Sequence, residues 1–133
     1  MELIEVKGAK TRPMFNLLPV ELYKNESCWI RPLDKDLNNV FDPAVNGAFK
    51  YGKCIRWILK NEGKVIGRIA AFVNDKTKDK DNDQPTGGVG FFECIQNQEA
   101  ANLLFDCAKQ WLVGQGMEAM DGPINFGDRD KWW

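Results

Sequence analysis

The chain has no histidine, and this absence excludes several kinds of active site. A Ser-His or Cys-His pair cannot form within these 133 residues, and neither can a metal site built on imidazole. Any general base must therefore be a carboxylate, a perturbed lysine or cysteine, or a bound water. The four cysteines form no CxxC pair: Cys28, Cys54, Cys94 and Cys107. We therefore expect reduced thiols, no zinc or other metal site, and a cytoplasmic protein.

The chain also lacks a strong excess of either charge and any long apolar run. Its formal net charge is −1, so it has no electrostatic footprint for nucleic acid. No apolar segment approaches the length of a membrane span, and the N-terminal MELIEVKGAK has no signal-peptide pattern. We therefore expect neither nucleic acid nor membrane as a partner. The apolar share of 44% is that of a globular protein, so residues 1–133 are expected to form a single domain.

What the chain does contain is a clear strand–helix–strand pattern between Gly87 and Phe126. Its helical part places apolar residues at the i, i+3, i+4, i+7 spacing of one buried face. These residues are Ala100, Leu103, Leu104, Cys107, Ala108, Trp111 and Leu112. A strand, a helix and a second strand in this order predict a parallel crossover, because parallel neighbours require a long connection.

The preceding residues predict strands at both ends and short helices between them. Alternation in ELIEVK predicts a first strand, and CIRWILK and KVIGRIAAFVN predict a hairpin that turns at Asn61-Glu62-Gly63. Thr11 is expected to cap a helix that Pro19 divides into two pieces, and Asp34 is expected to cap another short helix that runs through Val40. Gly67, inside the second hairpin strand, indicates a bulge or a close backbone approach.

These segments, in this order, resemble the GNAT acyltransferase superfamily. The resemblance rests on GKVIGRIAAFVN, GVGFFECI, the helix EAANLLFDCAKQWLVGQGM and EAMDGPINF. The earlier LLPVELYKNESCWIRPL and FDPAVNGAF are similar to a bacterial group of longer GNAT-like proteins. The resemblance implies an α/β (α+β layered) fold with a mixed, mostly antiparallel sheet and a long helix in a strand–helix–strand unit. It also implies acetyl-CoA or another acyl-CoA as the cofactor.

The loop that would hold the cofactor departs from the GNAT pattern. Active GNAT enzymes carry Q/R-x-x-G-x-G/A there, and the glycines let backbone N–H groups approach the coenzyme A pyrophosphate. The candidate cofactor-binding residues at the corresponding positions are Cys94, Ile95, Gln96, Asn97 and Gln98. They include no glycine and no cation, and Glu99 follows in the first helical turn, so the loop is expected to be degenerate. Asn97 has the alternative role of capping the helix.

Glu93 is the candidate catalytic base. It lies near the carboxyl end of the strand where GNAT enzymes position the thioester, and a carboxylate there can accept a proton directly or through water. The alternative is that strand alternation sends one of Glu93 and Cys94 outward and buries the other. Trp29, in a loop, and Asn125, after the last strand, are candidates for a ligand pocket.

Two functions are compatible with these residues. The resemblance implies an acyl-CoA-dependent N-acyltransferase whose degenerate loop leaves the isolated chain inactive. The alternative is a non-catalytic domain that packs on a second domain or self-associates as a homodimer. GNAT domains usually continue past the last strand found here, whereas this chain stops at Trp132-Trp133. Residues 1–133 are therefore expected to be the N-terminal part of a longer protein, incomplete at the C-terminus and followed by a C-terminal domain.

Overall fold

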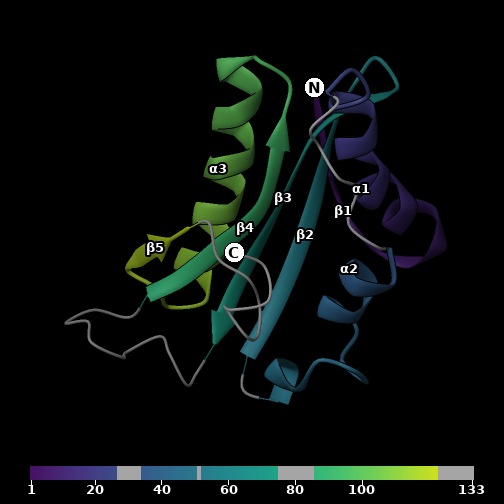
Figure 1. Ribbon diagram of the computed structural model, residues 1–133. Coiled ribbons are helices and arrows are strands. Elements are labelled where there is room, and N and C mark those ends of the chain that lie inside the picture. Colours follow the sequence, from purple (N-terminus) through teal and green to yellow (C-terminus); the bar gives the residue numbers. More distant parts are fainter. Residues whose placement is uncertain (27–33, 51, 75–85, 123–133) are drawn as a thin grey trace.

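The computed structural model describes residues 1–26, 34–50, 52–74 and 86–122, which form a mixed sheet with helices on both faces (Figure 1). The strands are β1 (Glu2–Glu5), β2 (Gly52–Asn61), β3 (Lys64–Asn74), β4 (Thr86–Cys94) and β5 (Ala119–Asp121). The helices are α1 (Gly8–Leu22), α2 (Asp34–Val40) and α3 (Gln98–Gly114), with a short 3-10 helix at Gly47–Lys50. This is the predicted α/β, mostly antiparallel fold.

The order of the strands in the sheet is the order in the chain, β1-β2-β3-β4-β5. The first three pairings are antiparallel, and β4 and β5 pair in parallel. The β2–β3 hairpin turns as predicted, through Glu62 and Gly63, which both have positive φ. The parallel β4–β5 pair, joined through α3, confirms the predicted crossover.

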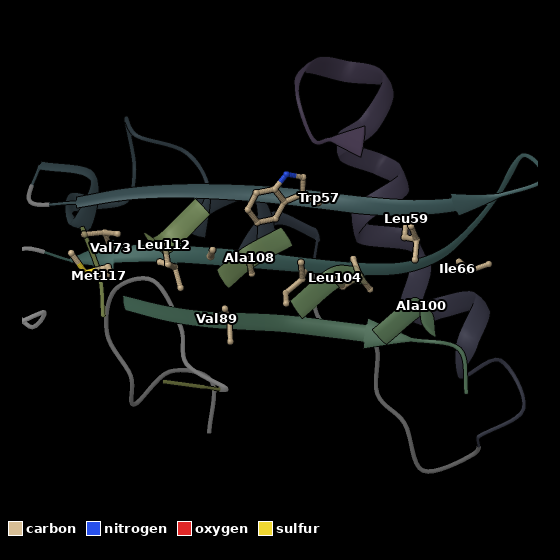
Figure 2. Packing of buried hydrophobic residues seen from close by; sticks show 12 residues of the cluster. Trp57, Leu59, Ile66, Val73, Val89, Ala100, Leu104, Ala108, Leu112 and Met117 are labelled. Atoms are coloured by element: carbon tan, nitrogen blue, oxygen red, sulfur yellow. The ribbon is translucent and has the colours of Figure 1, made fainter. Parts of the chain in front are cut away.

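Helix α3 covers one face of the sheet with the apolar side that the sequence spacing predicts. Ala100, Leu104, Ala108 and Leu112 are buried, and they meet residues of β2, β3 and β4 in one cluster (Figure 2). The other three members of the predicted side are half-buried and pack against that cluster: Leu103, Cys107 and Trp111. Trp111 contacts Trp57 of β2 edge-on, with ring centroids 6.4 Å apart.

Two glycines let α3 approach the sheet closely. A Cβ added at Gly67 of β3 would lie 2.6 Å from Leu104 Cδ1, and one at Gly87 of β4 would lie 2.5 Å from Leu112 Cδ2. The pairing of β2 with β3 also shifts register between Leu59 and Lys60, opposite Gly67. Both expectations for Gly67, a bulge and a close approach, are therefore confirmed.

The opposite face of the sheet is covered by α1 and α2 and is rich in aromatic rings. Phe15 of α1 is fully buried there and contacts the ring of Phe41, which follows α2, at a centroid distance of 5.6 Å. Phe72 of β3 and Phe91 of β4 complete this second cluster. Two arginines, Arg56 of β2 and Arg68 of β3, are buried on the same side.

The prediction of two helical pieces capped by Thr11 is wrong, because α1 is one helix with Lys7 at its N-cap position. The Thr11 hydroxyl instead lies one turn inside and donates to the Lys7 carbonyl. Pro19 has no N–H to donate to the carbonyl of Phe15, the residue one turn earlier. That carbonyl accepts from Arg68 Nη1 at 2.8 Å, so a strand residue replaces the helical hydrogen bond. The helix therefore continues past Pro19.

Candidate functional site

The candidate site lies at the carboxyl end of β4, where Glu93 meets a residue that is distant in sequence. The Tyr23 hydroxyl, just after α1, donates a hydrogen bond to Glu93 Oε2. Arg68 is the partner of Glu93 in the β3–β4 register. Tyr23, Arg68 and Glu93 thus come from three elements and form one group, which we call the Tyr-Glu-Arg cluster.

A bulge in β4 precedes Glu93. Arg68 pairs with Glu93, whereas Ala70 pairs with Gly90, so two residues of β4 oppose a single residue of β3. Phe91 lies in this bulge with φ of 55°, a backbone conformation that bulky residues rarely adopt. Its ring packs in the aromatic cluster, 5.2 Å from Phe41. The bulge therefore changes which face of the sheet the side chains of β4 point to, just before Glu93.

Arg68 joins this bulge to α1. Its Nε donates to the Phe91 carbonyl at 2.9 Å, and its guanidinium carbon lies 4.6 Å from the centroid of the Phe15 ring. Burial lowers the pKa of Arg68 to about 10, while the nearby Glu93 opposes that shift. Arg68 is therefore charged at neutral pH and presents a fixed positive charge beside Glu93.

Tyr23 is held in its neutral form by the same group. The hydrogen bond to Glu93 and burial raise the pKa of Tyr23 to about 12. In the unfolded chain a tyrosine ionises near pH 10. Between these values the unfolded state loses a proton that the folded state keeps, so stability falls as pH rises from about 10 to about 12.

We expect Tyr23→Phe to remove this alkaline loss of stability. Unfolding free energies of both proteins, measured by denaturant titration at steps of pH, should differ most at neutral pH and converge as pH rises through this window. Lysine titration is common to both proteins and cancels in the difference. A difference that is constant with pH would show that Tyr23 does not donate to Glu93.

The five predicted cofactor-binding positions run from Cys94, the last residue of β4, through the turn to Gln98, the first residue of α3. Asn97 is the N-cap of α3, and its side chain accepts from the Ala100 N–H at 3.1 Å. The capping role predicted as the alternative for Asn97 is therefore present. Glu99 lies in the first turn of α3, where its charge complements the helix dipole. A pyrophosphate at this turn would meet that carboxylate.

Beyond Gly88, β4 has a side that no strand among the described residues covers. Thr86, Gly87 and Gly88 pair with β5, and β5 ends at Asp121. Gly122, which follows β5, lies against Val89. The side of residues 90–94 that faces away from β3, here called the β4 edge, comes after this contact and leads to Glu93. The edge and the Tyr-Glu-Arg cluster thus meet at the end of the same strand.

The remaining sequence predictions for the site have different outcomes. Glu93 bonds Tyr23 and Cys94 packs with the α3 cluster, so they lie on opposite faces, but both are half-buried, whereas the alternative expected one outward and one buried. Burial raises the pKa of Cys94, which makes its thiol a poor nucleophile. Trp29 and Asn125 lie outside the described residues. Within the part of the chain that is described, no group of His, Cys, Asp or Glu could hold a metal ion.

Sequence reasoning missed Tyr23 and Arg68. Arg68 had a signal, because it is a charged residue within the otherwise apolar run of β3, and such a residue needs partners when buried. Tyr23 had none, since it is 70 residues from Glu93 in the chain.

None of the described helices is long and apolar enough to cross a membrane.

Two curated proteins are similar to this chain in sequence. The chain is 26% identical over 131 residues to a bacterial ceramide synthase of Caulobacter vibrioides, covering 98% of the chain and 34% of that protein. It is 28% identical over 112 residues to Protein YghO of Escherichia coli, covering 84% of the chain and 28% of that protein. The chain therefore spans about a third of the length of the curated relatives that it matches. No family model matches it.

Solved structures show the same fold. A predicted acetyltransferase of Clostridium acetobutylicum, solved with acetyl-CoA, superposes with a TM-score of 0.64 at 14% identity, covering 99% of this chain and 94% of that one. The aminoglycoside acetyltransferase AAC(6')-Iy, with a CoA bisubstrate analogue, gives 0.61 at 14%, covering 94% and 81%. A tandem GNAT protein of clavulanic acid biosynthesis gives 0.60 at 13%, covering 86% and 33%. The chain therefore has the fold of the GNAT acetyltransferases.

Proposed function

We propose that this chain is the N-terminal, GNAT-like part of a cytoplasmic, acyl-CoA-dependent N-acyltransferase. Acetyl-CoA or another acyl-CoA lies along the β4 edge, with its thioester near Glu93. The acceptor amine attacks the thioester carbon, the thiolate of coenzyme A leaves, and Glu93 accepts the proton that the nitrogen loses. By itself the chain is not expected to catalyse the reaction, because its loop at Gln96–Gln98 binds the pyrophosphate weakly.

One observation carries this proposal: Glu93, hydrogen-bonded and flanked by a buried cation, ends a strand whose edge β5 leaves uncovered. The hydrogen bond from Tyr23 holds this carboxylate in place near the end of β4. The comparisons add support from two directions. The ceramide synthase is named for making an N-acylated amine, and the Clostridium acetobutylicum structure holds acetyl-CoA.

The test compares two ligands that share the acyl-pantetheine part. Acetyl-CoA carries the pyrophosphate and nucleotide, and acetyl-pantetheine lacks them. Calorimetric titration of the 133-residue chain should give dissociation constants for the two that agree within about twofold, since the turn adds little. Much tighter binding of acetyl-CoA would mean that the turn holds the pyrophosphate after all. The absence of binding by both ligands at millimolar concentration would contradict the proposal.

Changing Glu99 to glutamine should improve the binding of acetyl-CoA but not of acetyl-pantetheine. The substitution removes one negative charge from the first turn of α3, and we expect about a fivefold lower dissociation constant for acetyl-CoA. The matched control is Asp106→Asn, which removes the same charge from an exposed position farther along α3. An equal gain in both variants would indicate a general effect of net charge rather than repulsion at the turn.

The second candidate function is a non-catalytic domain that packs on a C-terminal domain or forms a homodimer. It is favoured by the Asn97 cap and by Glu99, which occupy the place of a phosphate-binding loop. The tandem GNAT protein, in which a similar fold makes up 33% of a longer chain, gives it a precedent. No binding of either ligand, together with concentration-dependent dimerisation in light scattering, would support this function.

A further inference from the structure

Arg56 of β2 is a buried cation that lacks a partner of opposite charge among the described residues. Its side chain is on the aromatic face, and the residue is 9% exposed. The guanidinium carbon lies 4.1 Å from the centroid of the Phe41 ring and 5.1 Å from that of Phe15. Aromatic faces attract the cation but accept no ordinary hydrogen bond. The Nη1 atom is buried and has no hydrogen-bond partner.

Arg68 shows how the same fold satisfies a buried guanidinium. It contacts the same Phe15 ring, yet it donates to two backbone carbonyls and has Glu93 as its neighbour in the sheet register. No hydrogen bond or ion pair joins the Arg56 guanidinium to another described residue. Buried charges in proteins are normally paired and hydrogen-bonded, because an uncompensated charge in the interior is costly.

The positive charge of this region extends to the surface. Arg12 of α1 is exposed, and its positive charge is close enough to help lower the pKa of Arg56. Burial lowers the pKa of Arg56 to about 10, so Arg56 is still charged at neutral pH. Two arginines, Arg56 and Arg68, thus flank the Phe15 ring, and Arg12 adds a third positive charge near Arg56. An anion near Arg12 would face a second cation, Arg56, which lies against the rings of Phe15 and Phe41.

We propose that Arg56, held against the rings of Phe15 and Phe41, binds an oxyanion of a small molecule, a carboxylate or a phosphate group, with Arg12 at the solvent side. A guanidinium whose Nη1 has no hydrogen-bond partner is suited to such a group, because guanidinium donors match the spacing of two oxygens. This proposal does not depend on acyl transfer.

The test uses the 133-residue chain with inorganic phosphate and with acetate, each compared with sodium chloride at equal ionic strength. Thermal unfolding gives the stabilisation by each anion, and arginine side-chain NMR reports whether the Arg56 signals move. We expect phosphate, acetate or both to raise the unfolding midpoint beyond chloride and to shift the Arg56 signals. The anion with the stronger effect identifies the chemical class of the ligand.

Three variants locate the effect. Arg56→Met should raise the anion dissociation constant at least about tenfold, because a charged hydrogen bond is lost in a buried setting. Arg12→Met should raise it about threefold, and Lys10→Met, which removes a neighbouring exposed charge from the same helix, should leave it unchanged. If Arg56→Met does not fold, the anion dissociation constants of Arg12→Met and Lys10→Met are compared instead, and a larger increase in Arg12→Met supports the proposal. Equal stabilisation by chloride, or equal effects of these two variants, would overturn the proposal.

Discussion

Replacing Leu104 by aspartate should unfold the chain at room temperature. Leu104 is fully buried at the centre of the interface between α3 and the sheet, and its Cδ1 fills the space left by Gly67 (Figure 2). The substitution removes the leucine from the core and buries a carboxylate there without a partner, at an expected cost of about 5 kcal/mol or more. A domain of ordinary stability cannot absorb such a loss.

The matched control is Val113→Asp, which introduces the same carboxylate on the same helix at a position that is 61% exposed. This variant should stay within about 1 kcal/mol of the unsubstituted chain. Circular dichroism during thermal unfolding measures both proteins. A cooperative transition of Leu104→Asp near the temperature of the control would show that the assigned packing of α3 on the sheet is wrong.

Arg68→Ala should be the most damaging change on the other face. It leaves the carbonyls of Phe15 and Phe91 without their donor and removes the cation beside Glu93. We expect a loss of about 3 to 5 kcal/mol, since two buried acceptors and one carboxylate lose their partners together. Because Pro19 offers no N–H to Phe15, the second half of α1 should lose helical structure first.

Two controls separate these effects in denaturant titrations. Arg68→Lys keeps the charge but cannot donate to both carbonyls as the guanidinium does. Its stability should therefore lie between that of the unsubstituted chain and that of Arg68→Ala. Lys64→Ala removes an exposed charge from the same strand and should be nearly neutral. If Arg68→Ala and Lys64→Ala proved equally stable, Arg68 would not hold α1 against the sheet.

The parts of this fold that the sequence predicted are those governed by local spacing. The buried side of α3 follows from apolar residues three and four positions apart, and the β2–β3 turn follows from a glycine between two apolar runs. Asn97 as a helix cap needs only its own neighbours. In each case the interaction that forms the element lies within a few residues.

The parts that were missed depend on partners from distant segments. Pro19 was expected to divide α1, because the donor that rescues the helix comes from Arg68 in another element. The predicted base Glu93 could be placed on its strand, but its partner Tyr23 could not be named. The left-handed backbone of Phe91 is equally invisible in sequence, because nothing but the register of β3 against β4 demands it.

The agreement between strand order and chain order affects how the sheet assembles. Strands β2 and β3 meet through a two-residue turn, and β4 is the next strand in the chain, so these three can pair without waiting for a helix. Strand β1 must wait for α1 and α2, and β5 must wait for α3. With three paired residues, β5 has the smallest hold on the sheet. We therefore expect the boundary of the β4 edge to form late during folding and to open early in the native protein.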